Sequence, residues 1–283
     1  MMRSLILTTM AAGVLCAQVT PDAALSRNKD TWHPLVEMMK PKTVRATDAQ
    51  LEKLKALPME AMWGALRSKG YSNCCVTGLK TTRPGERLVG RVKTIRGLPG
   101  RPDLSEAARA LAKAGGWSDR NNVRAAEESE PGDVWVVDLG GMVADGIFFG
   151  DISALGAQVN GARGFVLWGG SRDKEELEQM AGLPVFAVGF DPGVNTSVTT
   201  DWNVPVRVGN VSVVPGDVVV ADTEVVMFFP ASIADHVIDH ATRVMEKENY
   251  ERDLVRQKKH RFRDVYPLNK ELNEEYERKR KKQ

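Results

Sequence analysis

The order of apolar runs between residues 86 and 230 constrains the fold of this 283-residue chain more than any other feature. The first elements predicted there are a strand over 86–97, a helix over 105–115, and strands within 131–141 and 183–189. Short strands then cluster over 204–230, separated by glycine and proline turns. Strands and helices that alternate first and are followed by a cluster of strands predict an α/β domain with a mixed sheet.

Two helices are expected before the first strand. Thr47 and Gln50 have the spacing of a capping box, so a helix begins there. A second helix is predicted between Pro58 and Gly70, because proline suits a first helical turn and glycine suits a stop. One face of this second helix, which is expected to pack on the domain, carries Met59, Met62, Trp63 and Leu66.

The first residues form a separate unit. Arg3 precedes an apolar run from Leu5 to Leu15 and then small residues, which is typical of a secretory signal peptide. The run is shorter than the about 20 residues that a membrane-spanning helix needs. We therefore expect residues 1–17 to be removed and the protein to be periplasmic or secreted, without a stable membrane anchor; a buried N-terminal helix is the alternative. A full-length intact mass for protein exported by its native host would contradict this expectation.

The predicted domain covers residues 46–245 and follows an N-terminal arm at 18–45. From residue 246 to residue 283 the chain is highly charged and ends in a basic run, which predicts a solvated helical tail. The net charge of the whole chain is only +2, so its composition gives no reason to expect nucleic-acid binding.

Two pairs of metal-binding residue types are expected to be structural. Cys74 and Cys75 are adjacent, and adjacent cysteines rarely bridge one another; two cysteines also cannot form a four-ligand zinc site. We expect them to be packing residues. His236 and His240 have i,i+4 spacing on a helix that starts near Ala231 and could meet one metal ion, but the sequence offers no matching third ligand.

A helix is predicted to begin at Asp151, because aspartate after Gly150 is a favourable N-terminal residue. The helix can end at Gly161 or Gly164. One of its faces carries Ile152, Leu155 and Val159. The run 165–168 then predicts a short buried strand, and the Gly-Gly-Ser that follows it predicts a turn.

The lengths of these elements predict that Arg172 and Asp173 return to the neighbourhood of Asp151. About ten helical residues rise about 15 Å, and four or five strand residues return about 13–16 Å. Two carboxylates and a guanidinium beside a helix N-terminus can hold a divalent cation together with an anionic substrate. The spacing alone fits a structural salt-bridge cluster equally well, so both alternatives stay open at this point.

Asp151, twenty intervening residues and Arg172–Asp173 match the Asp-x20-Arg-Asp signature of the 4-hydroxy-4-methyl-2-oxoglutarate aldolases. These belong to the regulator of ribonuclease activity A-like (RraA-like) family. The segments PGDVWVVDLGG, GARGFVLWGGSRD, LPVFAVG and VVPGDVVVAD also resemble family segments in the same order, over roughly residues 60–245. The resemblance implies a swivelling β/β/α three-layer domain with a mixed sheet, assembled as homotrimers or homohexamers with active sites near subunit boundaries.

The resemblance also implies an activity, that of a Mg²⁺- or Mn²⁺-dependent class II-type aldolase. Such a lyase cleaves a 4-hydroxy-2-oxo acid by a retro-aldol reaction and releases pyruvate, with oxaloacetate decarboxylation as a companion activity. Asp173 would bind the metal, Arg172 would contact the 2-oxo acid and its developing enolate oxygen, and Asp151 would orient metal-bound water or assist proton transfer. Backbone N–H groups would hold the substrate carboxylate, in a loop that includes Gly140, Gly141, Met142 and Val143.

Two positions depart from the family pattern and bear on substrate identity. Trp168 stands where relatives commonly carry aspartate, and Val225 stands where they usually carry glycine. The alternative function is that of a non-catalytic RraA-like binding or regulatory protein, because some members inhibit a ribonuclease and have lost the second aspartate of the signature. This chain retains that aspartate as Asp173.

Overall fold

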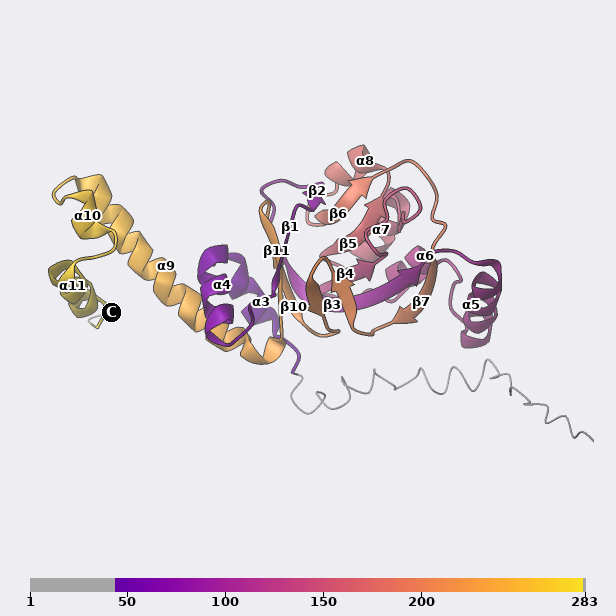
Figure 1. Cartoon of the computed structure of the whole chain (residues 1–283), viewed down its shortest axis with the longest axis horizontal. Helices are drawn as coiled ribbons and strands as arrows, with labels where there is room; N and C mark the ends of the chain where they lie inside the picture. The colour runs from indigo at the N-terminus through magenta and orange to yellow at the C-terminus, as the bar shows by residue number, and fades with distance from the viewer. Residues whose placement is uncertain (1–43, 282–283) are drawn as a thin grey trace, which may run out of the picture.

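The computed structural model describes residues 44–281, and Figure 1 shows a sheet flanked by helices, with one long helix leading away from it. The predicted signal peptide and most of the predicted N-terminal arm lie outside the described residues. The strands of the main sheet are β1 (Cys75–Thr77), β2 (Lys80–Thr81), β3 (Leu88–Leu98), β4 (Asp133–Asp138), β5 (Gly164–Ser171), β6 (Val185–Phe190), β7 (Val198–Trp202), β10 (Val218–Ala221) and β11 (Val225–Phe229). A separate hairpin consists of β8 (Val206–Val208) and β9 (Val211–Val213).

The helices fall into three groups along the chain. Those before and after β3 are α3 (Asp48–Lys55), α4 (Met59–Ser68), α5 (Pro102–Gly115) and α6 (Asn121–Glu127). Those around β5 are α7 (Asp151–Val159) and α8 (Lys174–Glu178). The C-terminal group consists of the short 3-10 helix η2 (Ala231–Ile233), α9 (Ala234–Gln257), α10 (Phe262–Val265) and α11 (Lys270–Arg280).

The sheet is mixed, as predicted. Its strand order is β1-β11-β10-β3-β4-β5-β6-β2, and β7 pairs with β3 beside this path. The central strands β3, β4, β5 and β6 are parallel, whereas β10, β11, β1, β2 and β7 join antiparallel. The parallel strands are connected through helices, which is the usual connection for parallel pairing. Among the antiparallel pairs of this sheet, β10 and β11 are consecutive strands joined by a short turn, whereas the other antiparallel pairs join strands that are distant in the sequence.

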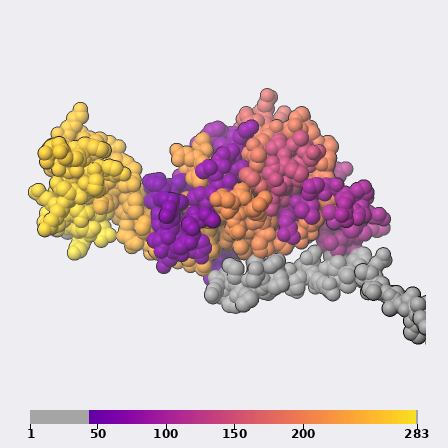
Figure 2. Space-filling model, viewed as in Figure 1, coloured from indigo at the N-terminus to yellow at the C-terminus, as the bar shows by residue number. Residues whose placement is uncertain are grey.

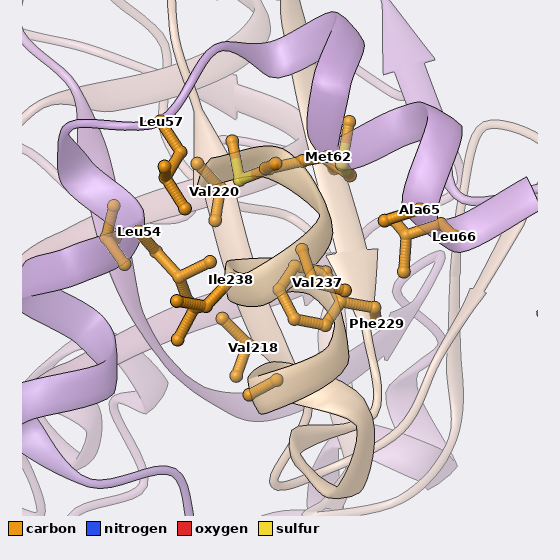
Figure 3. Packing of buried hydrophobic residues seen from close by; sticks show 14 of the residues in the cluster. Leu54, Leu57, Met62, Ala65, Leu66, Val218, Val220, Phe229, Val237 and Ile238 are labelled. Atoms are coloured by element: carbon orange, nitrogen blue, oxygen red, sulfur yellow. The ribbon is translucent and has the colours of Figure 1, made fainter. Parts of the chain in front are cut away.

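Alternate residues of the strands feed cores on opposite faces of the sheet, which produces three layers. One face is covered by α3, α4 and α9 over the β10–β11 side and by α6 and α7 over the β4–β5 side. The β8–β9 hairpin covers the other face. Figure 3 shows the first of these cores, where labelled side chains of the helices meet Val218, Val220 and Phe229 of the sheet. The β/β/α architecture expected from the family resemblance is therefore confirmed.

The N-terminal helices form where the sequence predicts them. Thr47 accepts a hydrogen bond from the backbone N–H of Gln50, and the Gln50 side chain accepts one from the backbone N–H of Thr47, so both halves of the capping box are present. Pro58 is the N-cap of α4 rather than its first helical residue. The structure adds elements that the patterns did not predict, namely β1, β2, α6, α8 and β7.

The predicted Gly-Gly-Ser turn is wrong, because these residues continue β5 to Ser171. Gly170 donates its N–H to the carbonyl of Gly146 and accepts a hydrogen bond from the N–H of Phe148. A Cβ at Gly170 would lie 2.7 Å from the carbonyl oxygen of Val143. Glycine is therefore needed here because another segment of backbone passes close to the strand, which is one of the common reasons for glycine within a strand.

The charged C-terminal tail is helical and forms a lobe of its own. Helix α9 runs without a break across residue 245 and carries α10 and α11 at its far end, where a small core consists of Leu254, Val265 and Leu272. Figure 2 shows this lobe in yellow, beyond the indigo N-terminal helices. Within residues 44–281, no helix combines the length and apolar character needed to cross a membrane.

Asp217 makes the stability of the fold depend on pH. Its carboxyl group is buried in the turn before β10, and burial raises its pKa to about 7, although a hydrogen bond from the N–H of Val214 opposes the shift. The native state therefore keeps a proton that the unfolded chain loses near pH 3.8. We expect the free energy of unfolding to fall as pH rises from about 4 to 7. The total fall is at most about 1.4 kcal/mol for each unit by which the pKa of Asp217 is raised.

The Asp217→Asn variant tests this expectation, because it retains an oxygen that can accept from Val214 and cannot ionise. Urea unfolding of both proteins at several pH values should show the variant gaining stability relative to the native chain between about pH 4 and 7. A difference that is constant over this range would contradict the expected titration.

Candidate functional site

The predicted site residues lie at the carboxyl ends of the parallel strands β4 and β5. The chain leaves β4 through the loop 139–150, which leads into α7, and it leaves β5 directly into Arg172 and Asp173. The two exits are tied together, because Ser171 Oγ donates to the carbonyl of Phe149 over 3.0 Å and the N–H of Arg172 donates to the same carbonyl over 3.2 Å. In open α/β sheets this edge is where ligands commonly bind.

The carboxylate of Asp173 sits at the first residues of α7. The backbone N–H of Asp151 donates to Asp173 Oδ2 over 3.3 Å. Gly150 has no side chain at this point, and a Cβ placed there would overlap Asp173 Oδ2. Because a helix N-terminus carries partial positive charge and free N–H groups, it stabilises a carboxylate in this position. The predicted return of Asp173 to Asp151 is thus present in the structure.

Asp173 adopts a left-handed backbone conformation, with φ 55° and ψ 46°. Aspartate tolerates this region better than most residues, although the conformation still carries an energetic cost. The residue precedes α8, whose first turn begins at Lys174 and whose Leu177 N–H donates to the carbonyl of Asp173. The tight exit from β5 therefore turns the Asp173 carboxylate back toward α7.

Arg172 lies beside Asp173 with its guanidinium partly in solvent. Arg172 Nε is 3.4 Å from Asp173 Oδ2, and the two side chains are 42% and 34% exposed. Both are accessible to a small molecule, and an ion pair this exposed contributes little to stability. A planar guanidinium beside a carboxylate leaves other N–H donors free for the oxygens of a ligand.

The predicted substrate-binding loop contains Gly140, Gly141, Met142 and Val143. Gly140 and Gly141 both have left-handed backbone conformations, with φ 66° and 80°. The N–H of Gly141 donates to the carbonyl of Trp168, and a Cβ at Gly141 would lie 3.4 Å from the Trp168 indole. Successive glycines with positive φ let this loop pass close to β5.

Trp168, which departs from the family pattern, supports this loop from the strand side. Its indole is half-buried, and its Nε1 is enclosed without a hydrogen-bond partner. The loop continues to Val143, which lies close to β6. A Cβ placed at Gly189 of β6 would lie 3.0 Å from the Val143 side chain. Gly140–Val143 thus rest on Trp168 and β6, while Arg172 and Asp173 lie at the end of the same strand as Trp168.

The apolar face predicted for α7 is not the face that α7 buries. Ile152, Leu155 and Val159 are 80%, 52% and 77% exposed, whereas Ala154 and Ala157 are fully buried. Gly156 lets α6 approach closely, because a Cβ there would lie 3.3 Å from the Cβ of Ala126, and Asn122 of α6 donates to Ser153 Oγ over 2.7 Å. Helix α7 therefore presents three large apolar side chains to solvent next to the site; we call this face the α7 stripe.

Sequence reasoning missed Gly150 and Ser171 as residues of the site. Gly150 provides the space for the Asp173 carboxylate, and Ser171 is a buried hydroxyl that ties the end of β5 to Phe149. A glycine directly before a helix-initiating aspartate was the available signal for the first. For Ser171, the predicted turn at this position hid its place in the strand.

A magnesium ion fits the donors of this site. Within residues 44–281, His, Cys, Asp and Glu side chains form no group of three or more that could hold a metal. Mg²⁺ nevertheless binds proteins through one or two carboxylates and keeps several waters, so an accessible carboxylate at Asp173 with Asp151 beside it is a suitable donor set. The centroids of the His236 and His240 rings are 6.2 Å apart. Within residues 44–281, no His, Cys, Asp or Glu side chain joins them as a third metal ligand.

Comparison with known proteins places this chain and its fold in a family. A family model described as RraA-like, Aldolase/RraA, matches residues 43–227. An uncharacterized protein of Methanocaldococcus jannaschii is 32% identical over 108 residues, which is 38% of this chain and about half (51%) of that relative. A putative 4-hydroxy-4-methyl-2-oxoglutarate aldolase of Halalkalibacterium halodurans is 29% identical over 157 residues, 55% of this chain and 73% of the relative.

A solved structure supports the same assignment. RraAS2 of Streptomyces coelicolor, described as an unusual member of the RNase ES inhibitor RraA protein family, superimposes with a TM-score of 0.63 at 26% identity. The alignment covers 74% of this chain and 98% of that protein. The family model spans more than half of the chain and includes the whole Asp151–Asp173 segment. The chain therefore belongs to the RraA-like (Aldolase/RraA) family.

Proposed function

We propose that this protein is a divalent-metal-dependent lyase that cleaves a 4-hydroxy-2-oxo acid by a retro-aldol reaction and releases pyruvate. The observation that carries the proposal is the position of the Asp173 carboxylate, held at the N-terminus of α7 with the Arg172 guanidinium 3.4 Å away. The family includes aldolases, and one relative is named as a putative aldolase of this type. Oxaloacetate decarboxylation is part of the proposal, because it forms the same pyruvate enolate.

The chain's own residues have distinct roles in this reaction. The Arg172 guanidinium contacts the 2-oxo acid and stabilises the negative charge that develops on its 2-oxo oxygen as the bond between C3 and C4 breaks. Backbone N–H groups of the loop Gly140–Val143 hold the substrate carboxylate. The Asp151 carboxylate assists removal of the proton from the 4-hydroxyl group, so that the leaving fragment departs as a carbonyl compound.

Asp173 would hold the metal ion, which is Mg²⁺ or Mn²⁺ in this proposal. When bound, such an ion supplies Lewis-acid polarisation of the substrate carbonyl, worth several kcal/mol of charge stabilisation. A metal ion held by few protein carboxylates keeps positions for water and substrate oxygens, which suits a hard cation that retains solvent ligands.

The experiment is direct. The purified protein is incubated with Mg²⁺ or Mn²⁺ and a panel of 2-oxo acids, including 4-hydroxy-2-oxo acids and oxaloacetate, and pyruvate is detected. Metal-dependent pyruvate release from at least one 4-hydroxy-2-oxo acid supports the proposal. Absence of release across the panel would favour the alternative, a non-catalytic binding protein, for which similarity to an RNase ES inhibitor family member is the supporting observation.

We also propose that the protein assembles as a homotrimer or homohexamer through the α7 stripe. Large apolar side chains in one exposed patch favour association. We expect Ile152→Glu to convert the assembly into monomers, as measured by light scattering, because it places a charge in the stripe. Leu98→Glu, at another exposed apolar side chain, is the matched control and should leave assembly unchanged. A native protein that is already monomeric at micromolar concentration would contradict the proposal.

We propose that the protein is exported to the periplasm or the medium, because residues 1–17 have the pattern of a secretory signal peptide.

A further inference from the structure

Cys74 and Cys75 bring their sulfur atoms together at the edge of the sheet. The two Sγ atoms are 3.6 Å apart. Successive residues of a regular strand point to opposite faces, yet both cysteines pack against the same core, because Cys74 precedes β1 and Cys75 begins it.

The two thiols are hydrogen-bonded to each other. The pKa of Cys74 is lowered, first by a hydrogen bond from the thiol of Cys75 and also by the positive charge of Arg67. The pKa of Cys75 is raised, because its proton is shared with Cys74 and because it is partly buried. A metal ion that binds both sulfur atoms displaces the thiol protons.

The geometry fits a bridging atom better than a disulfide. Consecutive Cα atoms lie about 3.8 Å apart, whereas disulfides usually join Cα atoms about 4.4–6.8 Å apart with sulfurs at about 2.05 Å. Two thiolates that share one tetrahedral ion with metal–sulfur bonds of about 2.3 Å lie about 3.8 Å apart. The observed separation of 3.6 Å is close to that value.

The pair is also reachable from solvent. Cys75 is half-buried on β1, which is an edge strand of the main sheet. Cys74 is buried but lines a pocket of about 250 Å³, whose wall includes the exposed residues Tyr71 and Asn73. The half-buried Cys75 is therefore the member of the pair that solvent reaches most directly.

We propose that Cys74 and Cys75 form a two-thiolate chelate for one thiophilic d¹⁰ metal ion of the Zn²⁺ or Cd²⁺ class. Binding forms two metal–sulfur bonds and releases the thiol protons to solvent, with no change of oxidation state. Within residues 44–281 no third His, Cys, Asp or Glu joins the pair, so solvent or an external ligand completes the shell. The site is separate from the Asp173 carboxylate, because β11, β10, β3 and β4 lie between β1 and β5 in the sheet.

The test uses Cd²⁺ as the probe and the reduced full chain with Cys16→Ser, so that the third cysteine cannot contribute. Excess Mg²⁺ is present to occupy oxygen sites. We expect one Cd²⁺ per chain, with the ultraviolet charge-transfer band of cadmium thiolate. Cys75→Ala should abolish the band and weaken binding about 100-fold or more, since even changes outside the ligand shell cost metal sites about 10–100-fold.

Three further samples complete the experiment. His236→Ala is the matched control and should keep both the band and the affinity. Cys74→Ala repeats the test at the buried position, with circular dichroism to confirm folding; the half-buried Cys75 variant decides the outcome if the buried one fails to fold. Absence of the band in the native pair, or its survival in Cys75→Ala, would overturn the proposal. A mass loss of two hydrogens on treatment with oxidised glutathione would also overturn it, by showing a redox pair instead.

Discussion

Replacing Asp173 by asparagine should lower the rate of pyruvate release by about 10²–10³-fold while the fold is retained. Asparagine has nearly the same shape and also tolerates the left-handed conformation of this residue, φ 55°. It removes the negative charge that would attract Mg²⁺. The same carboxylate accepts the hydrogen bond from the N–H of Asp151 in the native protein. Pyruvate release measured against Mg²⁺ concentration should therefore shift to higher concentrations in the variant.

Arg172→Lys separates the two members of the pair. Lysine retains the positive charge but loses the planar set of donors, so turnover should fall without a shift in the Mg²⁺ dependence. Asp264→Asn is the matched control, because Asp264 pairs with Arg261 in the C-terminal lobe, outside the site. Unchanged activity in both site variants, with folding confirmed by circular dichroism, would mean that Arg172 and Asp173 are structural and would favour the non-catalytic alternative.

Gly150→Ala should impair activity about as strongly as Asp173→Asn, by displacing a carboxylate that remains charged. The backbone of Gly150, with φ −123° and ψ −171°, is extended and permits alanine. The added Cβ would overlap Asp173 Oδ2 and lie 2.9 Å from Arg172 Nε, so both side chains must move. Small displacements of groups that position a substrate can cost about 10²-fold in rate.

Gly64→Ala provides the control for Gly150→Ala. Gly64 lies inside α4, where a Cβ would meet only His240 Nε2 at an ordinary 3.7 Å. Alanine is favoured over glycine in a helix by about 0.5–1 kcal/mol, so this variant should be at least as stable as the native protein and equally active. If Gly150→Ala also retained full activity, the Asp173 carboxylate would not need its observed position.

The central fold was predictable because its elements have clear patterns and unambiguous ends. The capping box at Thr47 and Gln50 marks α3, and the apolar run around Val134 marks β4. The Gly-Gly-Ser segment at 169–171 was not predictable, since glycine pairs usually indicate turns. Here they remain in β5 because a loop from β4 crosses them, and only the folded chain reveals that contact.

The site was predictable in its location and not in its details. The sequence predicted the return of Asp173 to Asp151, and the hydrogen bond between them confirms it. The length argument behind it was inexact, because it assumed a strand of four or five residues and β5 has eight. The sequence could not show that Gly150 makes room for the carboxylate, because the overlap arises from the direction of the turn at Asp173. It also could not show which face of α7 is covered, since the buried face carries the small residues Ala154 and Ala157 while the larger Ile152 and Val159 are exposed.

The hydrogen bond from Asp151 N–H to Asp173 Oδ2 has a consequence for ligand affinity. This hydrogen bond favours one orientation of the carboxylate, so in the proposed metal site an incoming cation would meet a preorganised ligand and would not have to order a freely rotating side chain. Ordering such a side chain on binding costs about 0.5–1.5 kcal/mol. The N-terminus of α7 orders the Asp173 side chain when the chain folds, so this entropy cost would not arise again each time a ligand binds.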